Sequence, residues 1–144
     1  MRLLGLDIGD KRIGVAVTDK LETIASPLTV FANDDKLKEN LIKIIKDYNV
    51  GKLIIGIPYN LKGEHGFQAE KIKTLVDEVL KDICSEIEYI DERFSSKISS
   101  GILKAEGKKV KKNTGNIDKI SAAVILNDYL AIKKNLYQNS LNSI

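Results

Sequence analysis

Three acidic residues stand where a buried sheet could bring carboxylates together. Asp7 lies inside an apolar run with glycines at positions 5 and 9, Glu92 ends a later apolar run, and Asp118 opens a long helical pattern. A carboxylate in a buried strand is costly unless it is paired or bound to a cation. Glycines beside it would let a metal ion or a phosphate approach closely. We therefore expect Asp7, Glu92 and Asp118 to be metal ligands and catalytic acids.

Carboxylate oxygens suit hard cations such as Mg²⁺ or Mn²⁺, which keep several of their waters. Two such ions, roughly 3.5–4 Å apart, can activate a water and stabilise the departing oxygen during attack on a phosphodiester. This chemistry needs no His or Cys nucleophile, and it fits a chain with one of each, His65 and Cys84.

Each acid also has a purely structural interpretation. Asp7 could cap the turn that follows it, and Glu92 could be a solvated strand end paired with a neighbouring cation. Asp118 could complement the dipole of the helix that it opens. The spacing of the three acids leaves these alternatives open.

Polar residues near the acids are candidates for contacts with an anionic substrate. Arg12 and Arg93 could hold a phosphate, or they could neutralise neighbouring acids. Asn60 could bind substrate or make a turn, and His65 could shuttle a proton or decorate a surface loop. A lysine-rich segment could contact phosphates or be a solvated loop. Its predicted substrate-binding members are Lys108, Lys109, Lys111 and Lys112.

The elements that must position these residues follow from the apolar spacing. Two strands joined by a Gly-Asp-Lys turn are expected within residues 2–19. The other expected elements are strands at 26–31, 52–57 and 87–92 and helices at 35–48, 67–81, 95–105 and 116–134. This order predicts an α/β fold with a mixed five-stranded sheet, in which an antiparallel meander precedes parallel crossovers and helices cover both faces. Residues 1–134 should form one domain, followed by a polar tail at 135–144.

Composition sets the cellular context. The 144 residues include 23 Lys plus Arg and 20 Asp plus Glu, and the net charge of +3 permits a polyanionic partner. The single cysteine cannot form an internal disulfide, and no apolar run approaches the ~20 residues of a membrane span. We expect a soluble cytoplasmic protein that makes no membrane contact and is a monomer or a weak homodimer.

Four stretches together resemble a known family. They are Gly5 to Ala16, Ile55 to Gly63 with Gln68 and Ala69, Asp91 to Ser96 and Ile117 to Leu126. In their order and spacing they resemble the YqgF family, also called RuvX-like, of Holliday junction resolvases and ribosomal-RNA-processing nucleases with an RNase H-like fold. The resemblance covers residues 2–132, with Tyr59 and Phe94 as its two departures from the expected motifs.

The resemblance implies that Asp7, Glu92 and Asp118 bind Mg²⁺ or Mn²⁺ and that Arg12 and Arg93 assist with the substrate. It implies a nuclease acting on structured RNA, in maturation of the 5′ end of the small-subunit ribosomal RNA precursor. Cleavage of branched DNA, as a Holliday junction resolvase, is the alternative substrate of the same chemistry.

Two other classes of function fit parts of the sequence. A non-catalytic nucleic-acid-binding module would keep the fold without turnover. A nucleotide-handling domain of the actin and sugar-kinase type also begins with Asp-x-Gly on a hairpin. Those proteins clasp ATP between two related domains, whereas this chain has room for one and lacks a Walker-type loop.

Overall fold

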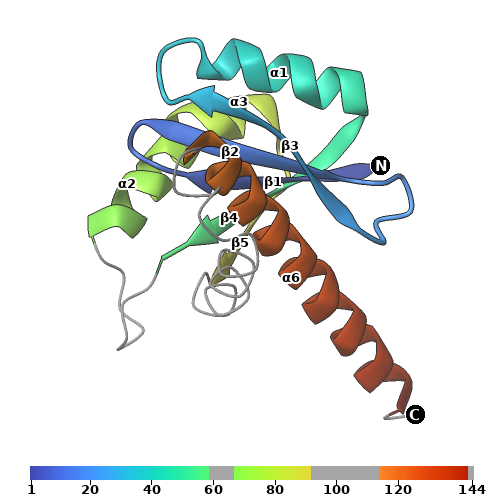
Figure 1. Ribbon diagram of the computed structural model, residues 1–144. Helices are drawn as coiled ribbons and strands as arrows, with labels where there is room; N and C mark the ends of the chain where they lie inside the picture. Colours follow the sequence, from blue (N-terminus) through green and yellow to red (C-terminus); the bar gives the residue numbers. More distant parts are fainter. Residues whose placement is uncertain (59–66, 92–113, 143–144) are drawn as a thin grey trace.

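A single five-stranded sheet with helices on both faces organises the computed structural model, which describes residues 1–58, 67–91 and 114–142 (Figure 1). The strands are β1 (Arg2–Ile8), β2 (Arg12–Thr18), β3 (Ala25–Ala32), β4 (Val50–Ile57) and β5 (Ile87–Asp91). Their order in the sheet is β3-β2-β1-β4-β5, with antiparallel pairs among β1, β2 and β3 and parallel pairs from β1 to β4 and from β4 to β5. The predicted mixed sheet is confirmed.

Helices cover the two faces of the sheet unequally. The helical segments are α1 (Leu37–Tyr48), α2 (Phe67–Leu75), the π-helical turn η1 (Val76–Leu80), α3 (Lys81–Ile83) and α6 (Thr114–Asn142). Side chains of α1, α2 and η1 share one buried cluster with the strands, and α6 supplies the helical part of a second cluster. In Figure 1 α6 crosses the sheet diagonally, on the face opposite α1.

The alternation of β1 explains this division into two cores. Leu4, Leu6 and Ile8 belong to the cluster with α1 and α2, whereas Leu3 belongs to the cluster with α6. Because successive side chains of a strand point to opposite faces, the odd-numbered residues of β1 face α6. Asp7 is one of them.

Several element boundaries differ from the sequence prediction. The helix predicted at 67–81 contains the π-helical turn η1, which leaves both Val76 and Leu80 fully buried. The last helix continues to Asn142 instead of ending near Lys134, since no glycine or proline between 135 and 142 interrupts it. The helix predicted at 95–105 lies outside the described residues.

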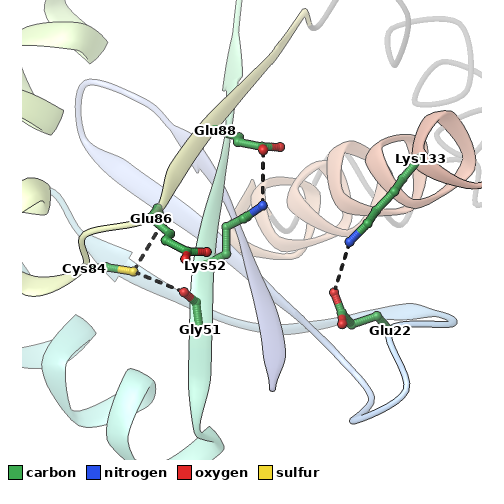
Figure 2. Close-up of polar contacts among 7 residues, drawn as sticks. All are labelled: Glu22, Gly51, Lys52, Cys84, Glu86, Glu88 and Lys133. Carbon is green, nitrogen blue, oxygen red and sulfur yellow. Dashed lines mark hydrogen bonds and ion pairs between the residues drawn. The ribbon is translucent and has the colours of Figure 1, made fainter. Parts of the chain in front are cut away.

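Polar contacts fasten the strands and α6 to one another (Figure 2). Lys52 on β4 and Glu88 on β5 form an ion pair at 3.1 Å. Beyond the sheet, Lys133 of α6 lies 3.7 Å from Glu22 in the turn between β2 and β3. The thiol of Cys84 points at the carbonyl oxygens of Glu86 and Gly51, 3.3 and 3.8 Å away, which fits a packing role.

Asn127 links α6 to the edge strand β3. Its side-chain oxygen accepts a hydrogen bond from the Ala25 N–H at 2.8 Å, and its amide nitrogen donates to the Ala25 carbonyl at 3.2 Å. We expect Asn127→Ala to lower the free energy of unfolding by about 1–3 kcal/mol, because the backbone N–H and carbonyl of the buried residue Ala25 both lose their partner. Chemical denaturation would measure the change, with Asn135→Ala, an exposed position of the same helix, as the control. Equal stability of the two variants would contradict the prediction.

Asp19 closes the turn between β2 and β3. Its carboxylate accepts hydrogen bonds from the Thr23 hydroxyl at 2.6 Å, the Thr23 N–H at 2.7 Å and the Ile24 N–H at 3.1 Å. These bonds, that from the Thr23 hydroxyl foremost, lower the pKa of Asp19 from 3.8 to about 2.

The turn should therefore tolerate acid. Because the pKa of Asp19 is lower in the folded than in the unfolded state, its ionised carboxylate stabilises the fold. This contribution is complete above pH 3.8, the pKa of the unfolded state, and it is lost as the pH falls through about 2. In an NMR titration the Asp19 carboxyl should titrate near 2, and in Thr23→Ala its pKa should rise toward 3.8. A midpoint that stays the same in both proteins would contradict this account.

No helix in the described ranges is both long enough and apolar enough to cross a membrane.

Candidate active site

Asp7 is the second-last residue of β1, at the end of the strand that leads into the β1–β2 turn. Gly5, two residues earlier, shows which way this side of the strand faces. A Cβ placed on Gly5 would lie 2.9 Å from the Leu126 Cβ and 3.1 Å from the Ala122 carbonyl oxygen, both on α6. Positions 5 and 7 share a face of the strand, so the partly buried Asp7 points toward the side covered by α6.

Gly14 brings Asp118 to the same place. It is the residue of β2 directly opposite Asp7 in the antiparallel ladder. Opposite residues point to the same face, with their Cα atoms ~4.5–5.5 Å apart. A Cβ on Gly14 would overlap the Asp118 carbonyl oxygen and lie 3.0 Å from the Lys119 nitrogen. The backbone of Asp118 therefore lies directly over Gly14, next to Asp7.

Asp118 is paired with a cation from the sheet. The Arg12 Nε donates a hydrogen bond to Asp118 Oδ2 at 2.9 Å, although the two residues are 106 positions apart in sequence. The side chains are 44% and 27% exposed, respectively. Arg12 was expected either to hold a phosphate or to neutralise a neighbouring acid, and in the structure it pairs with the acid Asp118.

The structure thus brings together three of the predicted site residues, Asp7, Asp118 and Arg12. The other predicted residues lie outside the described ranges. They are Asn60, His65, Glu92, Arg93, Lys108, Lys109, Lys111 and Lys112. Within residues 1–58, 67–91 and 114–142 no three His, Cys, Asp or Glu side chains cluster as a metal site would require, so the predicted trio with Glu92 stays a prediction.

The end of β5 adds a directional clue. Ile90 packs in the cluster with α6, and Glu88 is hydrogen-bonded by Tyr129 of α6, so the even-numbered residues of β5 face that helix. Asp91 is paired in register with Ile57, which belongs to the opposite core. Asp91 therefore faces away from Asp7.

A charged network anchors α6 farther from the site. The hydrogen bond from Tyr129 and the ion pair with Lys52 lower the pKa of Glu88, and the bond to Glu88 raises the pKa of Lys52. Burial raises the pKa of the Asp128 carboxyl. Asp128 and Tyr129 lie about ten residues beyond Asp118, or ~15 Å along the helix, so the contact of Tyr129 with Glu88 anchors α6 away from the acidic pair.

The tip of the β1–β2 hairpin borders a cavity of about 250 Å³ on the α2 side. Asp10 lines it and lies 3.5 Å from the Lys71 ammonium. Asn33 donates from its side chain to the Gly9 carbonyl at 2.8 Å and from its backbone to the Lys11 carbonyl at 2.9 Å. Asp10 is exposed and ion-paired here.

Sequence reasoning missed two residues that shape the site. Gly14 was one glycine of a motif, and only the contact with α6 shows why a side chain is excluded there. Asn33 lies between the expected strand at 26–31 and the expected helix at 35–48, and its hydrogen bonds hold the hairpin tip. Neither contact has a local signal, because both partners come from elsewhere in the chain.

Comparison with known proteins gives consistent results. Residues 1–132 match the model of the RuvX family, described as Holliday junction resolvase. A protein from Sulfurihydrogenibium, named "Putative pre-16S rRNA nuclease", is 45% identical over 131 residues, which are 90% of this chain and 89% of that protein. A protein of the same name from Fusobacterium nucleatum is 40% identical over 137 residues, 92% of this chain and 99% of its own length.

Solved structures agree on the fold. Thermus thermophilus RuvC in complex with a Holliday junction substrate has a TM-score of 0.57 at 10% identity, covering 93% of this chain and 96% of that one. The fowlpox virus Holliday junction resolvase has a TM-score of 0.50 at 14% identity, covering 94% and 99%. At this level of identity the likeness concerns the fold alone, and it confirms the RNase H-like architecture.

Proposed function

The chain belongs to the RuvX family, and from that premise we propose that it is a metal-dependent nuclease whose active site lies where α6 begins over the end of β1. The observation that carries the proposal is the meeting of Asp7 and Asp118 across Gly14. Two acids from distant parts of the chain converge at the end of β1, the central strand of the sheet. A fold has little reason to bring such charges together unless a cation accompanies them.

The residues present suit a divalent cation. Asp7 and Asp118 offer carboxylate oxygens, the donors that Mg²⁺ and Mn²⁺ prefer. The recorded partner of Asp118 is already a cation, Arg12, which shows that this position favours positive charge. Two bound ions would activate a water and stabilise the leaving 3′-oxygen, giving a 3′-hydroxyl and a 5′-phosphate.

Glu92 is the third acid of this proposal. Its role is predicted from the sequence, and Glu92 itself lies outside the described residues. This residue would follow directly on Asp91, which ends the described strand.

The chain's own residues have separate tasks in the proposed reaction. Asp7 and Asp118 hold the ions in fixed positions, since one sits on a strand and the other on a helix packed against that strand. Arg12, beside Asp118, supplies a guanidinium that can bind a phosphate. Further phosphate contacts are proposed for residues outside the described ranges. They are Asn60, Arg93, Lys108, Lys109, Lys111 and Lys112.

We take structured RNA, the 5′ end of the small-subunit ribosomal RNA precursor, as the natural substrate, which also places the protein in the cytoplasm. The names of the 45% and 40% identical relatives support RNA. The family description and the resolvase-like fold support branched DNA as the second candidate. A two-fold junction would favour a dimer, whereas RNA processing can be performed by a monomer.

The test is a cleavage assay with both substrates. Purified protein is incubated with an RNA spanning the 5′ leader of the small-subunit precursor, or with a four-way DNA junction, in Mg²⁺, Mn²⁺ or EDTA. We expect cleavage of the RNA that requires a divalent ion, and light scattering reports whether junction addition produces dimers. Salt-dependent binding without cleavage of either substrate would instead identify a non-catalytic binding module.

A further inference from the structure

The ion pair between Arg12 and Asp118 engages a carboxylate that the proposed function assigns to a metal ion. The Arg12 Nε lies 2.9 Å from Asp118 Oδ2. Arg12 is the first residue of β2, and it shares a face of that strand with Gly14, the residue over which the Asp118 backbone lies. The guanidinium therefore stands beside the acidic pair and not on a remote surface.

We propose that Arg12 is the resident counter-ion of Asp118 and that a divalent cation displaces Arg12 from this carboxylate when the cation binds. The inference rests on the proposed function, because it assumes that Asp118 is a metal ligand. The displaced guanidinium is then free to bind the substrate phosphate. Arg12 would thus couple metal binding to substrate binding.

Electrostatics makes the two cations competitors. The Arg12 Nε lies 2.9 Å from Asp118 Oδ2. A metal ion bound to this oxygen would therefore lie within a few ångströms of the guanidinium, and the two positive charges would repel each other. At 4 Å two unit charges interact by about 1–4 kcal/mol at effective dielectric constants of 80 to 20, and the repulsion from a divalent ion is about twice as large. Simultaneous occupancy is therefore disfavoured.

The setting of Arg12 permits the exchange. Its side chain is 44% exposed, so the guanidinium can leave Asp118 and regain water without opening the core. The bond to Asp118 uses Nε, and a guanidinium has four other N–H donors for a phosphate. A buried structural arginine could neither return to water nor offer free N–H donors to a phosphate.

NMR can observe this exchange directly because the chain has only three arginines, Arg2, Arg12 and Arg93. The Nε–Hε signals are recorded while Mg²⁺ is added to the full-length protein. We expect the Arg12 signal to move to the position that it has in Asp118→Ala without Mg²⁺, because alanine offers no acceptor to the Nε–H. The Arg2 signal should stay, because this side chain donates to the Tyr48 carbonyl, at 2.9 Å, in a different region.

Calorimetry of Mg²⁺ binding gives a second readout. Arg12→Gln removes the competing charge, so we expect binding about tenfold tighter than in the wild type. Arg12→Lys keeps the charge and should stay within about threefold. Lys133→Gln is the matched control because it removes one charge from the ion pair with Glu22, about 22 Å along α6 from Asp118. It should stay within about twofold.

The outcomes separate this inference from the proposed function. If Mg²⁺ shifts the backbone signals of Asp7 and Asp118 but leaves the Arg12 Nε–Hε signal in place, the metal site stands and the exchange is overturned. Unchanged or weaker Mg²⁺ binding by Arg12→Gln would overturn it as well. If Mg²⁺ shifts none of these signals, the metal site itself fails, and the exchange fails with it.

Discussion

Replacing Asp7 by asparagine should lower the rate of phosphodiester cleavage on the order of 10³-fold while the protein stays folded. The amide has the size of the carboxylate but carries no charge, so it cannot hold a divalent ion as strongly. The proposed ions supply several kcal/mol of transition-state stabilisation, and a loss of about 4 kcal/mol corresponds to roughly 10³ in rate. Single-turnover cleavage of the RNA leader in Mg²⁺ measures the effect.

Asp10→Asn is the matched control. It removes the same charge three residues along the chain, from an exposed carboxylate paired with Lys71 on the α2 side. We expect its cleavage rate to stay within about threefold of the wild type, because an exposed ion pair contributes little. If Asp7→Asn cleaves as fast as Asp10→Asn, the assignment of Asp7 as a metal ligand is wrong.

Local patterns were sufficient to predict the sheet. The continuous apolar runs of β1 and β4 are typical of strands that are covered on both faces, and the apolar spacing of α1 follows the helical period of 3.6 residues. The parallel crossovers after the antiparallel meander followed from the crossover rule, whereas the position of β4 beside β1 is known only from the structure. Asp7 stood out because a charge interrupted a buried strand.

Long-range packing could not be predicted in the same way. The hydrogen bond between Arg12 and Asp118 joins residues 106 positions apart, and sequence reasoning left open whether Arg12 pairs with an acid or awaits a phosphate. The π-helical turn at Val76–Leu80 contains one residue more than an α-helical turn, and the apolar spacing does not predict this extra residue. Both features depend on how the helices and strands pack against one another.

Small residues explain how a helix carrying an acid reaches a strand carrying another. Gly5 and Gly14 lie under Ala122 and Asp118, so the backbone of α6 approaches the sheet more closely than side chains would allow. Close approach places Asp118 beside Asp7, and the rigid sheet keeps it there. The glycines in the motif thus serve the site through packing.

The replacement of Gly14 by alanine should therefore impair both stability and catalysis. The added Cβ would overlap the carbonyl oxygen of Asp118, and a helix backbone cannot yield as a flexible side chain does. The start of α6 must move outward, at a cost of about 2–3 kcal/mol in the free energy of unfolding. A displacement of ~1 Å at a catalytic group costs on the order of 10² in rate, so cleavage should fall at least that much.

Gly51→Ala is the control that separates this effect from a general cost of adding a methyl group to a strand. A Cβ on Gly51 would lie 2.9 Å from the Met1 Sδ, and the long Met1 side chain can move aside. Denaturation curves and single-turnover rates of the two variants should differ strongly, with Gly51→Ala close to the wild type in both. If Gly14→Ala also matches the wild type in both, α6 does not lie against β2 as described, and the juxtaposition of Asp7 and Asp118 loses its structural basis.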